Sequence, residues 1–77
     1  MVNQLLKTES PERFVYELLC EKSSATESEI YEILSKKLDG VSKPRVKLAI
    51  MRLEMAGIAN TYERKENELV VALAEKD

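Results

Sequence analysis

The chain has no histidine and only one cysteine among its 77 residues. Without histidine, the commonest general base is missing, and so are the Ser-His and Cys-His pairs that activate a nucleophile. One cysteine with no histidine also excludes nearly every usual zinc or iron ligand set. We therefore expect a binding protein that is not an enzyme and that uses no metal and no cofactor.

Glycine is equally scarce. The two glycines, Gly40 and Gly57, each follow a predicted helix, where a residue able to adopt a positive φ ends the helix. No glycine is then left for a phosphate-binding loop. The single cysteine, Cys20, cannot form an intrachain disulfide. Because Cys20 stands beside Leu19 inside a predicted helix, we expect a small buried apolar side chain and not a reactive thiol.

Long hydrophobic runs are also missing. No apolar segment approaches the roughly 20 residues needed to cross a membrane. The first residues lack the basic and then apolar build of a signal peptide. The sequence therefore predicts an intracellular, cytoplasmic protein with no membrane partner. A chain of 77 residues has room for one hydrophobic core, so we expect a single domain.

The middle of the chain contains two capped helices joined by a short turn. Thr26 and Glu29 form a Thr-x-x-Glu capping box, in which each side chain can bind an unpaired backbone N–H at the start of a helix. That helix stops at Gly40, and Ser42 is a natural N-cap for the next one. Apolar residues recur at helical spacing in both helices: Ile30, Ile33, Leu34 and Leu38, then Val46, Ala49, Ile50 and Leu53. This pattern is typical of a helix-turn-helix.

A helix and a hairpin are predicted on either side of this pair. Upstream, Ser10-Pro11 begins a helix with one apolar face, formed by Phe14, Val15, Leu18 and Leu19. Downstream, two segments of strand character flank a polar segment that holds the turn-prone Asn67, which indicates a β-hairpin. We therefore expect helices near 11–22, 27–38 and 43–56, and strands near 58–63 and 69–73.

The runs Ser42–Val46 and Leu53–Ile58 resemble the recognition helix of MarR-like and Fur-like transcription regulators, and residues 10–73 as a whole resemble the winged-helix superfamily. The resemblance implies an α+β fold with a three-helix core, residues 10–57, followed by a two-stranded wing, residues 58–73. Residues 1–9 would be an N-terminal segment and residues 74–77 a tail of the same domain. It also implies a small DNA-binding transcription regulator.

Positive charge is concentrated in one segment, although the net charge of the chain is −2. Residues 1–39 carry five basic and eight acidic side chains. Residues 40–65 carry six basic and two acidic side chains, whereas residues 66–77 carry one basic and four acidic side chains. The basic segment holds the helix and the hairpin tip that a winged helix places against DNA. We therefore expect duplex DNA to be contacted by Lys43, Arg45, Lys47, Arg52, Arg64 and Lys65. The alternative is that these are ordinary solvated residues.

A second apolar stripe on the last helix favours another interpretation. When the core residues of that helix face inward, Pro44, Leu48, Met51 and Met55 point outward. Apolar side chains offer few hydrogen bonds for reading base edges, so low sequence specificity is expected.

Leu48, Met51 and Met55 would instead contact a partner subunit in a homodimer, another protein, or the chain's own N-terminal segment Met1–Leu6. The alternative function is thus a winged-helix protein-interaction module. We favour DNA binding, because the resemblance and the segregation of charge both support it.

Overall fold

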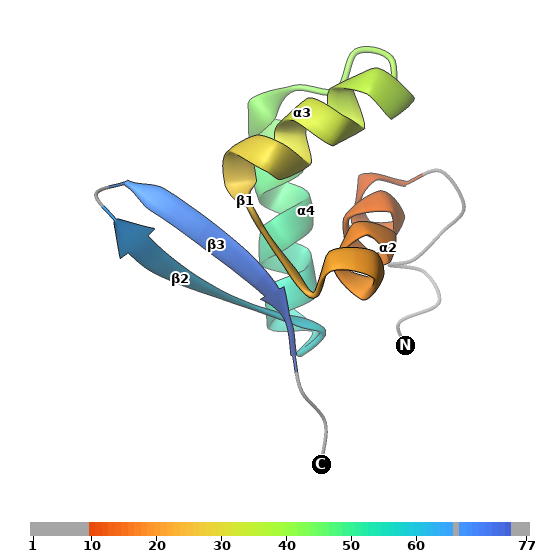
Figure 1. The fold of residues 1–77 in the computed structure, drawn as a ribbon. Coiled ribbons are helices and arrows are strands. Elements are labelled where there is room, and N and C mark those ends of the chain that lie inside the picture. The colour runs from red at the N-terminus through yellow and green to blue at the C-terminus, as the bar shows by residue number, and fades with distance from the viewer. Residues whose placement is uncertain (1–9, 66, 75–77) are drawn as a thin grey trace.

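The computed structural model describes residues 10–65 and 67–74, so the expectations for residues 1–9 and for 75–77 of the tail lie outside the described residues. The fold is α+β, with three helices and one antiparallel sheet of three strands in the described residues (Figure 1). The order is α2 (Pro11–Lys22), β1 (Ser24–Thr26), α3 (Glu27–Lys37), α4 (Lys43–Met55), β2 (Ala59–Lys65) and β3 (Glu68–Leu73). The helices lie together, and the β2–β3 hairpin projects to one side of them.

The structure contains the three predicted helices and the hairpin. The hairpin turn is shorter than expected, because β2 continues through Arg64 and Lys65 and β3 begins at Glu68. The starts of the helices follow from local caps. The Ser10 hydroxyl accepts a hydrogen bond from the backbone N–H of Arg13 at 3.1 Å, and the Ser42 hydroxyl accepts one from the backbone N–H of Arg45 at 3.3 Å. The capping box is reciprocal. The backbone N–H of Glu29 donates to the Thr26 hydroxyl at 3.1 Å, and the backbone N–H of Thr26 donates to the Glu29 carboxylate at 3.0 Å. These bonds satisfy backbone donors that have no partner inside the helix.

The sheet corrects the expectation of a two-stranded wing, because β1 adds a third strand. β1 pairs with β3, with Ala25 opposite Val71, so the strand order is β1-β3-β2. Ser23 has a positive φ of 72° and turns the chain out of α2. Thr26 is extended because an N-cap residue has β-region backbone angles, and this lets the cap serve as the last residue of a strand. A three-residue strand is too short to show alternation in the sequence.

The core lies between the helices and one face of the sheet. Its buried side chains are Val15, Leu18, Leu19, Ala25, Ile30, Leu34, Val46, Ala49, Ile50, Leu53, Ala59 and Val71. These include the apolar stripes predicted for all three helices, with Phe14, Ile33 and Leu38 partly buried against them. The packing fixes the rotation of each helix, and it therefore decides which residues of α4 point outward.

Cys20 is exposed, so the expectation of a buried cysteine is wrong. Leu19 faces the core, but the next residue in an α-helix is rotated by about 100°. That rotation moves Cys20 past the edge of the buried face of α2, so its position next to Leu19 in the sequence did not indicate burial.

Removing the capping box gives a first test of this architecture. Thr26→Ala should lower the free energy of unfolding by about 0.5–2 kcal/mol, because the backbone N–H of Glu29 loses its acceptor. Urea unfolding followed by circular dichroism measures this change. Ser28→Ala, at an exposed position in the same turn, is the control. Equal midpoints for Thr26→Ala and the original chain would contradict the cap.

Candidate nucleic-acid interface

The helix α4 presents four faces. Val46, Ala49, Ile50 and Leu53 face the core. Arg45 and Arg52 point toward α2, where both reach Glu12. Lys43 and Lys47 lie on the opposite flank, next to the start of α3. Leu48, Met51 and Met55 point away from the core and are exposed.

Arg45 and Arg52 converge on a single buried carboxylate. Arg45 donates two hydrogen bonds to Glu12, from Nη1 to Oε2 and from Nη2 to Oε1, both at 3.1 Å. Arg52 Nη1 lies 3.5 Å from Glu12 Oε2. Glu12 is 2% exposed, whereas the side chains of Arg45 and Arg52 are 35% and 53% exposed. The cluster thus joins α2 to α4 and leaves an excess of positive charge at the surface.

The electrostatics of Glu12 follow from this geometry. Burial raises the pKa of a carboxyl, but hydrogen bonds from Arg45 and the backbone, with the charges of both arginines, outweigh it. The pKa of Glu12 is therefore lowered from its ordinary value of 4.5. Sequence reasoning missed this residue. An acidic residue in the first turn of a helix is common, and nothing local shows that its partner lies 33 positions away.

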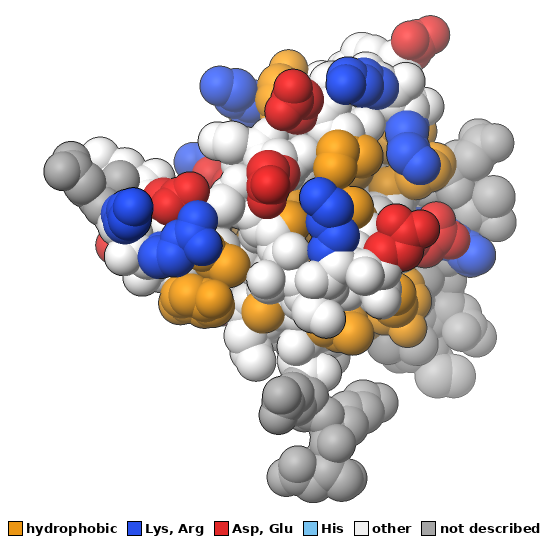
Figure 2. Space-filling view, in the orientation of Figure 1, with side chains coloured by type: hydrophobic (Ala, Val, Ile, Leu, Met, Phe, Trp, Pro, Cys, Tyr) orange, Lys and Arg blue, Asp and Glu red, His pale blue; other side chains and the backbone are white. Residues whose placement is uncertain are grey.

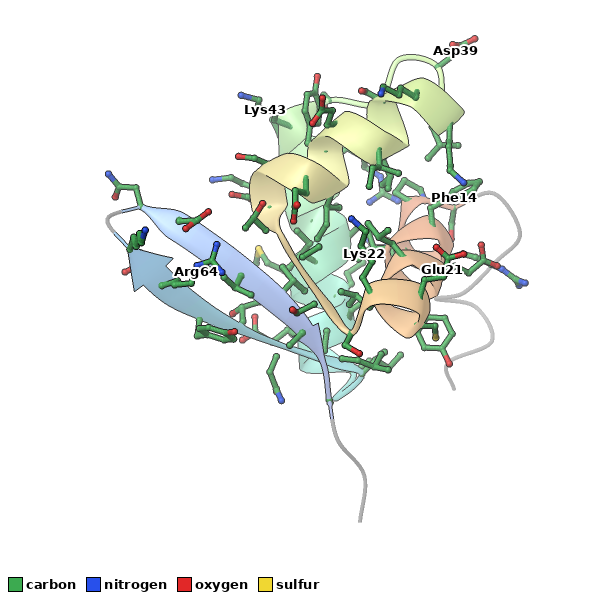
Figure 3. All side chains as sticks on the ribbon, viewed as in Figure 1. Phe14, Glu21, Lys22, Asp39, Lys43 and Arg64 are labelled. Atoms are coloured by element: carbon green, nitrogen blue, oxygen red, sulfur yellow. The ribbon has the colours of Figure 1, made fainter. Side chains whose placement is uncertain are left out.

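Lys43 and Lys47 border the start of α3. Lys43 extends from the beginning of α4 on the side where the hairpin projects (Figure 3). Its Nζ lies 5.6 Å from the centre of the Tyr31 ring, a cation-π distance. Lys47 is exposed and has no ion pair with another described residue. A small cavity of about 70 Å³ separates the two helix starts and is lined by Glu27, Ser28, Tyr31, Lys43, Val46 and Lys47.

The other two predicted contact residues lie near the hairpin tip, where Figure 2 shows Lys and Arg side chains among acidic ones. Arg64 makes a bidentate pair with Glu68 across the hairpin, with Nε–Oε1 at 3.2 Å and Nη2–Oε2 at 3.1 Å. Lys65 is exposed and, among the described residues, has no ion pair. It borders a shallow hollow that runs from the hairpin tip to Glu27 and Ser28.

The start of α3 therefore lies between the lysines of α4 and Lys65 of the hairpin. The structure brings Lys43, Lys47 and Lys65 to one edge of the molecule. Arg64 lies on the same hairpin, while Arg45 and Arg52 lie on the α2 side of α4. Glu27 and Glu68 share the lysine edge, so its positive potential comes from individual exposed ammonium groups and not from an uninterrupted basic surface.

The outward stripe is exposed, as the helical spacing predicted. The exposed fractions are 39% for Leu48, 53% for Met51 and 82% for Met55. On the hairpin side of α4, Glu54 accepts a hydrogen bond from the Thr61 hydroxyl at 3.1 Å, which fixes β2 beside the helix. The predicted covering by Met1–Leu6 concerns residues outside the described ranges.

Within residues 10–65 and 67–74, no group of three or more His, Cys, Asp or Glu side chains could hold a metal ion. The same part of the chain has no helix that is long and apolar enough to cross a membrane. Comparisons with protein-family models, curated proteins and solved structures find no match to this chain.

Proposed function

We propose that this chain is a winged-helix module that binds duplex DNA through α4 and the β2–β3 hairpin. The order of a helix, a helix-turn-helix and a hairpin supports the winged-helix assignment. The observation that carries the proposal is the position of Lys47 and Lys65. These two exposed ammonium groups, neither of which forms an ion pair with a described residue, come from α4 and the hairpin and border the start of the same helix, α3. A winged helix uses the corresponding pair of elements on DNA.

The chemistry of such contacts is electrostatic. Lys43, Lys47 and Lys65 would each neutralise a backbone phosphate, and Arg64 would share its guanidinium between a phosphate and Glu68. Arg45 would act mainly in the fold, because both of its terminal nitrogens are bound to Glu12. Phosphate contacts carry no base sequence, so the loss of one of them should weaken binding to unrelated duplexes by a similar factor.

Single lysine substitutions test this assignment. Lys47→Ala and Lys65→Ala should each weaken binding to two unrelated duplexes about tenfold at about 50 mM salt, because each loses one counterion-release contribution. Each should also reduce the slope of log affinity against log salt by about one. Fluorescence anisotropy of a labelled duplex measures both quantities. Lys36→Ala also removes one positive charge, but at the other end of α3, and it should leave the affinity and the salt slope unchanged.

The exposed stripe supports a second candidate, a protein-interaction module. If Leu48, Met51 and Met55 met another subunit or protein, complete burial would stabilise the complex by roughly 1.5–3 kcal/mol for each side chain. Sedimentation distinguishes the candidates. A dimer that Met51→Glu dissociates without unfolding, together with no duplex binding at low salt, would favour this second function.

A further inference from the structure

We infer that the stripe of Leu48, Met51 and Met55 faces the floor of the DNA major groove and contacts the C5-methyl groups of thymine. This inference rests on the proposed duplex binding. It addresses a question that the lysines leave open, namely what the apolar outer face of α4 recognises. Thymine is the base that offers an apolar group in the major groove, and leucine and methionine can contact that methyl group without a hydrogen bond.

The dimensions of the stripe fit this position. Leu48 and Met55 are seven residues apart, which is about 10 Å along an α-helix. That length corresponds to about three base-pair steps of about 3.4 Å each. The major groove is about 12 Å wide and admits a helix, whose diameter with side chains is about 10–12 Å. β2 is held at the side of α4 by the bond from Thr61 to Glu54, and the stripe stays exposed beside it.

The charges on either side of the stripe match those on either side of a groove. At about 100° per residue, Lys47 and Arg52 each lie about 70° from the centre of the stripe, on opposite flanks of α4. The flank of Lys47 lies on the same side as Lys65 of the hairpin, because both lysines border the start of α3. Arg52 is half exposed beside Arg45, and their two positive charges share the single negative charge of Glu12. An apolar strip between two cationic rims complements base methyl groups between two rows of phosphates.

The same charges argue against a second copy of this helix as the occupant. α4 carries four basic residues and one acidic residue. In an antiparallel two-fold pair seated on the stripe, equivalent flanks meet, so Arg52 would approach Arg52 of the other copy near the axis. In a parallel pair, the flank of Lys47 would meet the flank of Arg52, and both of these residues are basic. Like charges directly opposite each other disfavour association. A polyanion is attracted by every one of these side chains except Glu54.

Replacing thymine with deoxyuridine tests the inference, because it removes only the methyl group. The original chain should bind a thymine-containing duplex about tenfold more tightly than the matched deoxyuridine duplex, since each contacted methyl contributes roughly threefold. In Leu48→Ala and Met51→Ala, the ratio of the affinity for the thymine duplex to the affinity for the deoxyuridine duplex should fall toward one. Tyr62→Ala changes a comparably exposed side chain on β2 and should keep the original ratio. Circular dichroism verifies that each variant is folded.

The outcomes separate the inference from the proposed function. Equal affinities of the original chain for the two duplexes would overturn methyl recognition while duplex binding stands. A loss of affinity in Met51→Ala that is the same on both duplexes would also overturn it. No binding of either duplex at about 50 mM salt would overturn the proposed function itself, because phosphate contacts are strongest at low salt.

Discussion

Replacing Lys47 and Lys65 together with glutamate is expected to weaken duplex binding by about 100-fold or more at about 50 mM salt. Each lysine contributes roughly tenfold through counterion release under that condition, and each new carboxylate adds repulsion from the phosphates. Both side chains are exposed and are without an ion pair in the described part of the chain, so the fold should tolerate the change. Anisotropy titration measures the affinity.

The matched control reverses the charge of two other lysine side chains. Lys36→Glu with Lys37→Glu gives the same change in net charge, but at the last turn of α3, away from its start. If both double variants bind equally weakly, the affinity depends only on the net charge of the protein, and the edge formed by α4 and the hairpin has no special role.

Glu12→Ala is expected to have the largest effect on stability among the charged residues. It should lower the free energy of unfolding by about 1.5–3 kcal/mol, the range for hydrogen bonds to charged groups. The loss falls short of that for a fully buried ion pair because both arginines reach solvent. Glu17→Ala, which removes an exposed pair with Arg13 on the same helix, should cost only about 0.3–0.5 kcal/mol. Similar urea midpoints for the two variants would contradict a structural role for Glu12.

Acid should remove the contribution of Glu12. Because its pKa is lower in the folded chain than its ordinary value of 4.5, the ionised carboxylate stabilises the fold above that pH. The contribution is lost as the pH falls through the lowered pKa. Stability curves of the original chain and of Glu12→Gln should therefore converge below about pH 4.5. Parallel curves down to strong acid would show that Glu12 has no shifted pKa.

Local signals explain how much of the fold could be predicted. The capping box of Thr26 and Glu29 and the cap at Ser42 involve residues three positions apart, so the sequence shows them directly. Apolar spacing then identified the buried face of each helix and the outward stripe of α4. β1 was missed because its pairing with β3 joins segments more than 40 residues apart, and such pairing leaves no mark in a three-residue strand.

The same limit applies to the candidate site. The six basic residues were identified by charge alone, and charge does not reveal which of them have partners. Only the packing of α2 against α4 shows that Arg45 is bound twice to Glu12, and only the register of the hairpin shows that Arg64 lies against Glu68. Lys43, Lys47 and Lys65 are exposed, and no described acidic residue forms an ion pair with them, so we propose these three as contacts to DNA.

A titration of the original chain against a duplex of random sequence, at several salt concentrations, tests the central claim most directly. With four phosphate contacts from Lys43, Lys47, Arg64 and Lys65, and a fifth from Arg52 on the other flank of α4, log affinity should fall against log salt with a slope between about −3.5 and −4.5. The affinity would then drop at least about 100-fold between about 50 and 200 mM salt. No binding at the lowest salt, or an affinity that salt does not change, would contradict duplex binding by α4 and the hairpin.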